Sequence, residues 1–173
     1  MKLSSERLLL RGYSESDWER IHVYGSDAEF SQYELWGPNS EADTKKFVDD
    51  MMKQQIEKDR YKFDFAVCEQ ATGLLIGGCG IRRESQKSSV ANLGWAITPL
   101  AQGKGYATEA AARLIEFGFS ELKLRVIYAT CDSRNIASYR VMEKLGMKRV
   151  GFLEGDKIEK GFRRDTYRYE LLA

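Results

Sequence analysis

The chain has 173 residues, 43% of them hydrophobic and 31% charged, which is the composition of one globular domain with its own core. Its 27 basic and 26 acidic side chains leave a formal net charge of +1, so no overall field draws it to nucleic acid or to an anionic membrane surface. No apolar run is long enough to span a membrane, and the first residues lack the apolar core of a signal peptide. We therefore expect a single cytoplasmic domain over residues 1–173.

The side chains that bind metals or form disulfides are few and scattered. Cys68, Cys79 and Cys131 form no C-x-x-C pair, and His22 is the one histidine of the sequence. Each cysteine lies in an apolar stretch, where a free thiol behaves as a small hydrophobic side chain. We expect reduced cysteines and no metal site. A Ser-His-Asp site would need His22, which falls on a predicted helix and shows no such partners.

The first part of the chain predicts one strand and two helices. Residues 7–13 (RLLLRGY) predict the strand. Residues 14–25 predict a helix that begins at a serine and ends at a glycine, and residues 39–58 predict a second helix capped by Asn39 or Ser40.

From Lys62 onward the pattern predicts strands interrupted by two helices. The expected strands are 62–69, 74–83, 88–97, 124–131, 147–155 and 163–172, and the expected helices are 105–119 and 135–146. The first of these helices connects two strands as a β-α-β unit, which makes those strands a parallel pair. The chain therefore predicts an α+β fold, with a mixed, mostly antiparallel sheet of about seven strands flanked by about four helices.

Residues 101–110 (AQGKGYATEA) place two glycines and a lysine directly before a helix. Glycine allows the backbone to approach a ligand closely, and a helix N-terminus offers free N–H groups to an anion such as phosphate. A P-loop would need Ser or Thr after Lys104, where Gly105 stands. A dinucleotide fingerprint would need a third glycine where Thr108 stands. Both of these nucleotide sites are excluded.

The remaining pattern resembles the GCN5-related N-acetyltransferase (GNAT) superfamily. Gln102, Gly105 and Ala107 fill the acetyl-CoA signature of that family, and NIASYRVMEKLGM (135–147) resembles its downstream helix. ERLLLR near the start and RRDTYRYELL at the end resemble the ribosomal-protein (RimJ/RimL-like) branch. The resemblance implies the GNAT fold, in which a parallel pair of strands splays apart around acetyl-CoA.

The resemblance also implies where acetyl-CoA binds. Backbone N–H groups of the glycine-rich loop would hold the pyrophosphate, with Lys104 and Arg140 adding charge. The strand that contains GWAI would pair with the pantetheine arm, and Asn135 would hold that arm from the opposite side. The implied cofactor residues are Trp95, Ala96, Ile97, Gln102, Gly103, Lys104, Gly105, Tyr106, Ala107, Thr108, Asn135, Ser138 and Arg140.

The general acid is open at this point. Many relatives have a tyrosine where this chain has Met142, and a methionine cannot donate a proton. The resemblance shifts the role to Ser138, to Tyr139 or to water. Ser138 could equally be a small packing residue of the helix.

The general base is also open, because Asn92 stands where relatives often have a glutamate. Glu34, Glu84 and Asp132 are alternatives, and we assign none of them. Without a base, the rate should follow the pKa of the acceptor amine itself, which is about 8 for a protein α-amine and about 10.4 for lysine. Residues 30–38 resemble the acceptor wall of the family, so Tyr33 and Trp36, together with Asn92, are the candidates for contact with the acceptor.

The sequence thus predicts an acetyl-CoA-dependent N-acetyltransferase that acts on a primary amine by direct attack in a ternary complex. The acceptor is either a protein N-terminus or a small amine, and the protein is a monomer or a homodimer. The alternative is a non-catalytic acyl-CoA-binding or regulatory module, since Met142 and Asn92 replace two catalytic residue types. Nucleic-acid binding is disfavoured because the sequence has no basic stripe.

Overall fold

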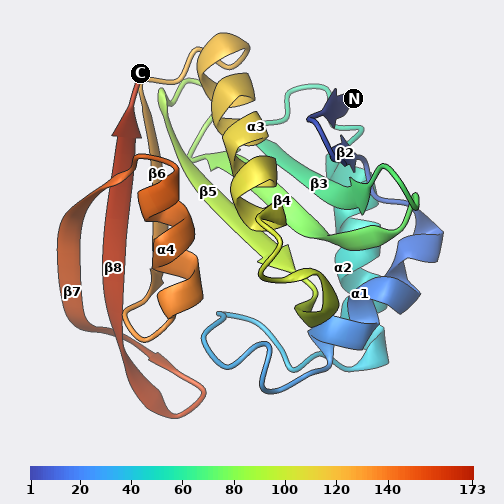
Figure 1. The fold of residues 1–173 in the computed structure, drawn as a ribbon, viewed down its shortest axis with the longest axis horizontal. Coiled ribbons are helices and arrows are strands. Elements are labelled where there is room, and N and C mark those ends of the chain that lie inside the picture. Colours follow the sequence, from blue (N-terminus) through green and yellow to red (C-terminus); the bar gives the residue numbers. More distant parts are fainter.

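The computed structural model describes residues 1–173, apart from the side chain of Glu159. The strands are β1 (Lys2–Ser4), β2 (Leu8–Arg11), β3 (Lys62–Glu69), β4 (Leu75–Arg83), β5 (Val90–Ile97), β6 (Val126–Asp132), β7 (Lys148–Glu159) and β8 (Phe162–Leu172). The α-helices are α1 (Trp18–Gly25), α2 (Glu41–Gln54), α3 (Tyr106–Ser120) and α4 (Ile136–Lys144). They surround one eight-stranded sheet with the order β1-β2-β3-β4-β5-β6-β8-β7 (Figure 1).

This arrangement confirms the α+β fold with a mixed, mostly antiparallel sheet, and it adds one strand. β1 has only three residues and pairs with β2, too short a segment to show an alternating pattern. The C-terminal hairpin is also longer than expected, because β7 continues past Gly155 to Glu159. Gly155 has a φ of +54° and lies in a register shift of the hairpin. The alternating sequence pattern therefore ends at this glycine, although the strand continues beyond it.

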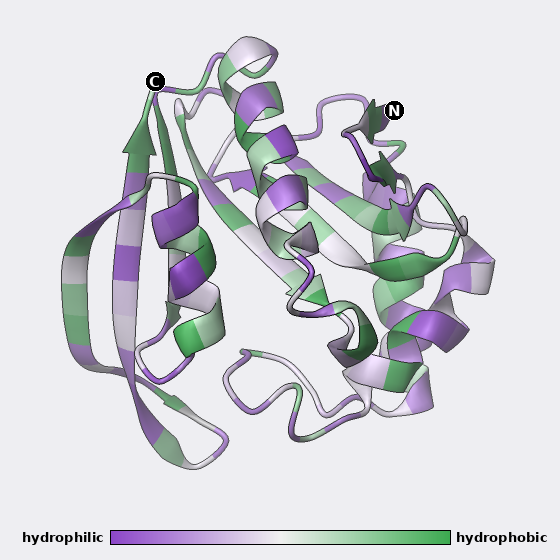
Figure 2. Cartoon of the chain, viewed as in Figure 1, coloured by the Kyte–Doolittle hydropathy of each residue, from purple (hydrophilic) through white to green (hydrophobic). Residues whose placement is uncertain are grey.

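The sheet is covered on both faces. α3 packs on one face over a core that contains Phe65, Ile81, Leu93 and Leu114, while α1 and α2 cover the other face over Tyr13 and its neighbours. Figure 2 shows hydrophobic and hydrophilic residues alternating along α3 and α4, as amphipathic helices on a sheet require. No helix of the described chain is long and apolar enough to cross a membrane.

β5 and β6 are the parallel pair, and they separate after a short paired stretch. Their register runs only from Val90 opposite Val126 to Asn92 opposite Tyr128, although β5 stays paired with β4 as far as Ile97. Figure 1 shows the two strands diverging from their common end. One edge of β5, from Leu93 to Ile97, therefore faces a gap instead of a neighbouring strand.

Candidate functional site

The glycine-rich loop before α3 has the backbone that its sequence predicts. Gly103 has a φ of +75° and Gly105 a φ of +83°, in the left-handed region that favours glycine. Gly105 is the N-cap of α3, and no side chain caps the helix there. The N–H groups of the first turn, from Tyr106 to Thr108, thus remain free for an anion at the positive end of the helix dipole.

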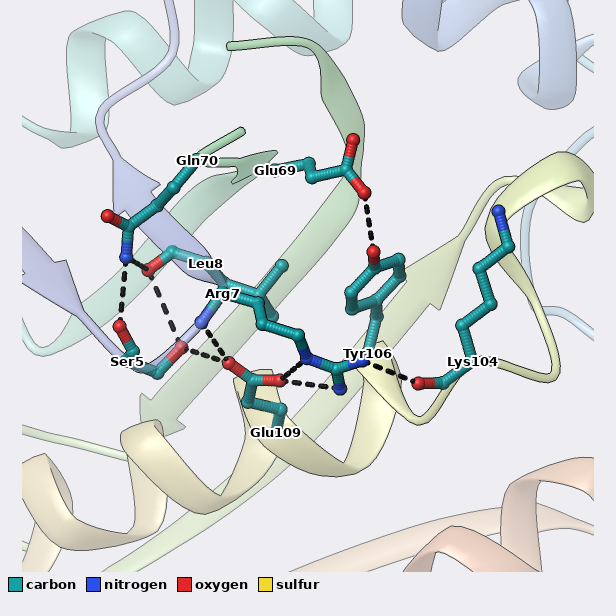
Figure 3. A network of polar contacts seen from close by, with 8 residues as sticks. All are labelled: Ser5, Arg7, Leu8, Glu69, Gln70, Lys104, Tyr106 and Glu109. Atoms are coloured by element: carbon teal, nitrogen blue, oxygen red, sulfur yellow. Dashed lines mark hydrogen bonds and ion pairs between the residues drawn. The ribbon is translucent and has the colours of Figure 1, made fainter. Parts of the chain in front are cut away.

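A polar network fixes this loop to the start of β2 (Figure 3). Nη1 of Arg7 donates to the carbonyl of Lys104 at 3.1 Å, and Nε of Arg7 donates to the Glu109 carboxylate at 2.7 Å. Glu109 also accepts from the Ser5 hydroxyl and from the backbone N–H of Arg7, each at 2.7 Å. The phenol of Tyr106 donates to Glu69 at the end of β3. The loop is therefore tied to two strands before any ligand binds.

The N-terminus of α4 lies across the gap from the free edge of β5. Asn135 is the N-cap of α4, where its Oδ1 accepts from the backbone N–H of Ser138 at 3.0 Å. Asn135, Ser138 and Met142 share one face of the helix, and all three line a cleft that Trp95 and Ala96 of β5 also line. The three side chains thus line one cleft, and their contact with the cofactor stays a prediction.

This cleft has a volume of about 840 Å³ and lies between the sheet, α1, α2, α4 and the α1–α2 loop (residues 26–40). Its aromatic lining comes from Tyr13, Tyr24, Tyr33, Trp36, Phe47 and Trp95. Its ionisable acids and bases are Glu34, Asp43, Asp50, Asp64, Lys46, Arg82 and Arg164. An aromatic cleft with a few polar groups, beside a free strand edge, suits a small organic substrate.

Small residues on neighbouring strands form the floor of the cleft. Gly78 lies opposite Ala96, and Gly80 lies opposite Gly94, so these four residues share one face of the sheet. A Cβ on Gly78 would lie 2.5 Å from the hydroxyl oxygen of Tyr13, which donates to the carbonyl of Phe65 at 3.1 Å. Gly78 therefore leaves the space that Tyr13 occupies above the sheet.

We expect Gly78→Ala to destabilise the protein by about 1–3 kcal/mol, because the added methyl overpacks the contact with Tyr13. Tyr13→Phe should relieve that contact, since the next atom of the ring, Cζ, would lie 3.8 Å from the new Cβ. Urea unfolding of the two single variants and the double variant would measure the coupling. Additive losses in the double variant would contradict this account of Gly78.

The three carboxylates considered as a base lie in different surroundings. Glu84 is exposed and does not line the cleft. Asp132 is buried and accepts from Nε and Nη2 of Arg134 at 2.9 and 2.7 Å. Burial alone would raise the pKa of Asp132, but the bonds from Arg134 outweigh it and hold that pKa below its ordinary value. Glu34 lines the cleft, and burial raises its pKa above the ordinary value, with Arg164 and Lys160 partly opposing that rise.

The residues expected at the site are only partly brought together, because Ile97 and the glycine-rich loop (residues 102–108) do not line the cleft. The predicted acceptor residues Tyr33, Trp36 and Asn92 all line the cleft. Tyr139, in contrast, packs edge-on against Tyr167 with ring centroids 5.9 Å apart and is not part of the cleft lining. Arg140 is exposed and lies 3.7 Å from Glu143. No cluster that could hold a metal ion occurs among the described residues.

Two arginines of the site were not found from the sequence. Arg7 lies in the quoted ERLLLR segment, but only the fold brings it to the glycine-rich loop. Arg164 lies in the quoted RRDTYRYELL segment, and the hairpin turns it into the cleft. Arg7 lies 97 positions from its partner Lys104, and Arg164 lies 131 positions from its partner Tyr33. No local motif therefore marks either arginine.

Comparisons with known proteins agree with this geometry. The sequence profile of the acetyltransferase (GNAT) domain family matches residues 7–148. The chain is 37% identical over 173 residues to the uncharacterized N-acetyltransferase YnaD of Bacillus subtilis, covering 99% of this chain and 97% of that protein.

Two solved structures share the fold. An acetyltransferase (GNAT family) from Bacillus anthracis matches with a TM-score of 0.90 at 35% identity, over 99% of this chain and 98% of that one. RimL, a ribosomal L7/L12 alpha-N-protein acetyltransferase in complex with coenzyme A, matches with a TM-score of 0.85 at 19% identity, over 99% of this chain and 98% of that one. The chain therefore belongs to the GNAT family and is an acetyl-CoA-dependent N-acetyltransferase.

Proposed function

We propose that the cleft binds a primary amine, whose nitrogen attacks the acetyl thioester directly while both substrates are bound. The observation that supports this most is the position of Trp95 and Ala96. They lie on the edge of β5 that has no partner strand and also line the cleft, so a thioester along that edge would meet an amine in the cleft. Holding two reactants in one site removes much of the entropy cost of their reaction.

The cofactor would bind in two parts. The pyrophosphate would accept from the free N–H groups at the start of α3, with the loop from Gln102 to Gly105 around it. The pantetheine would pair with the backbone of residues 93–97, and a strand N–H there would stabilise the oxyanion of the tetrahedral intermediate. Asn135 would hold the arm from α4 through its amide nitrogen.

The state of the cleft cysteines supports direct attack over an acetylated enzyme. Cys79 and Cys131 both line the cleft and are buried. Burial raises the pKa of Cys131 to about 11 and that of Cys79 to about 12. Both therefore stay protonated at neutral pH, and a protonated thiol is a poor nucleophile. Reduced thiols also fit a cytoplasmic enzyme.

Ser138 is the acid that we propose for the departing thiolate. It lies in the cleft on the first turn of α4, with its hydroxyl beside the thiol of Cys131. Ser138→Ala should lower kcat about tenfold or more and leave the KM for acetyl-CoA nearly unchanged, since the bond forms mainly in the transition state. Steady-state rates taken where chemistry limits turnover would show this. Equal kcat values would make Ser138 a packing residue.

Glu34 is the base that we propose. The sequence alone favoured a site without a base, because Asn92 cannot take a proton. In the fold, Glu34 lines the same cleft as Asn92, while Asp132 is neutralised by Arg134. A carboxylate whose pKa is raised by burial is a better proton acceptor near neutral pH than an ordinary one.

The acceptor class and the branch of the family belong to this proposal. A small amine or a protein N-terminus is the candidate acceptor, and the RimJ/RimL-like branch is suggested by the terminal segments and by the shared fold with RimL. Thiol release from acetyl-CoA, measured with a panel of amino acids, peptides and polyamines, tests the enzyme activity. Coenzyme A binding without turnover of any amine would favour the alternative, a non-catalytic acyl-CoA-binding module.

A further inference from the structure

Arg164 is a buried cation in the cleft. It lies on β8, is only 6% exposed and contributes to the cleft lining. Its Nη1 donates to the carbonyl of Tyr33 at 3.3 Å, whereas its Nε is buried without a partner among the described residues. A guanidinium carries five N–H donors, and leaving a buried one unpaired is costly. Arg164 therefore has an N–H donor left to bind a hydrogen-bond acceptor of a ligand.

The carboxylates nearest to Arg164 do not neutralise it directly. Asp132 lies close enough to feel its charge, but its oxygens already accept from Arg134. Glu34 also feels the charge of Arg164, yet no ion pair within 4.0 Å joins the two among the described side chains. A buried charge is ordinarily paired, and none of the described side chains forms an ion pair with Arg164.

The other charged side chains of the cleft are already engaged. Asp64 is paired with Arg82 on the floor, and Asp50 is paired with Lys46 on α2. Asp43 closes the capping box of α2. One acid and one base, Glu34 and Arg164, are therefore left to meet a substrate.

Resting on the proposed function, we infer that Arg164 binds a carboxylate of the acceptor, and that the acceptor is an amine that carries this carboxylate, as an α-amino acid does. The planar guanidinium fork matches the two oxygens of a carboxylate. Glu34 stands in the same cleft to meet the amine. A polycation would bring its charges to the buried Arg164, which makes a polyamine a poor acceptor.

Matched pairs of acceptors test this inference. Each α-amino acid is compared with its α-amide by thiol release from acetyl-CoA, with kcat/KM expressed per concentration of free amine, because amidation changes the pKa of the amine. In the wild type we expect the acid to be preferred at least about tenfold, as for a lost charge-assisted bond. Arg164→Gln should reduce that preference to about twofold or less.

Two further variants separate charge from structure. Arg163→Gln removes a charge from the exposed neighbour on β8 and should keep the full preference for the acid. Arg164→Lys keeps the charge but lacks the planar guanidinium fork, so it should keep part of the preference for the acid. Coenzyme A affinity, measured by calorimetry, should be equal in all variants, which shows that the cofactor site is intact.

The outcomes separate this inference from the function on which it rests. Turnover in which acids and amides react equally, or in which peptides or polyamines react best, would overturn the inference and leave the acetyltransferase proposal standing. If no acceptor gives thiol release, the proposed function is overturned, and this inference with it. An unchanged preference in Arg164→Gln would remove Arg164 from the acceptor site.

Discussion

Gly105→Val is expected to weaken acetyl-CoA binding by about tenfold or more in a protein that still folds. Gly105 has a φ of +83°, which a β-branched residue reaches only with strain, and it caps the helix whose first N–H groups would hold the pyrophosphate. The added Cβ would lie 3.5 Å from Nη2 of Arg7, an ordinary van der Waals contact, so the strain comes from the backbone conformation. Strain here moves the N–H groups away from the phosphate.

Gly73→Val is the matched control. Gly73 has a φ of +69° in the turn between β3 and β4, and nothing lies within 4 Å of its added Cβ. It carries the same kind of backbone strain away from the cleft, so its affinity for acetyl-CoA should be that of the wild type. Calorimetry on both variants decides the matter. Unchanged affinity in folded Gly105→Val would exclude the loop as the phosphate site.

Glu34→Gln is expected to lower kcat by about 100-fold or more, because it removes the proposed proton acceptor while keeping the shape of the side chain. Burial raises the pKa of Glu34, with Arg164 and Lys160 opposing it, so the carboxylate is ionised only above this raised pKa. In the wild type, kcat should therefore rise with pH through an inflection above the ordinary pKa of a glutamate. In the variant that inflection should be absent.

Acceptors of different pKa identify the source of the inflection. An inflection that stays at one pH for all acceptors belongs to the enzyme, whereas one that follows the acceptor belongs to the amine. Should the inflection of the wild type move with the acceptor and level off near about 8 for an α-amine, the enzyme works without a base. Glu34 would then only shape the cleft.

The elements of the proposed cofactor side could be predicted from the sequence because they depend on backbone and local pattern. The glycines of the loop and the shared face of Asn135, Ser138 and Met142 follow from spacing within one element. The divergence of β5 from β6 also follows from the resemblance, and the paired stretch that ends at Asn92 confirms it.

The acceptor side could not be predicted as fully because it is built from distant segments. Glu34 was one of three equal candidates, and only the fold shows that it shares a cleft with Asn92 while Arg134 neutralises Asp132. Arg164 had no signal of its own, since its burial depends on the hairpin of β7 and β8 lying beside the α1–α2 loop. Burial and unpaired donors are properties of the fold and not of local sequence.

Hydrogen–deuterium exchange of the backbone amides, with and without coenzyme A, tests the central claim most directly. The claim is that the cofactor pairs with the free edge of β5 and places its phosphates on the N-terminus of α3. Coenzyme A should slow exchange most in residues 93–97 and 103–108, where its bonds to backbone N–H groups would form. Binding of coenzyme A with no added protection in either segment would contradict the account.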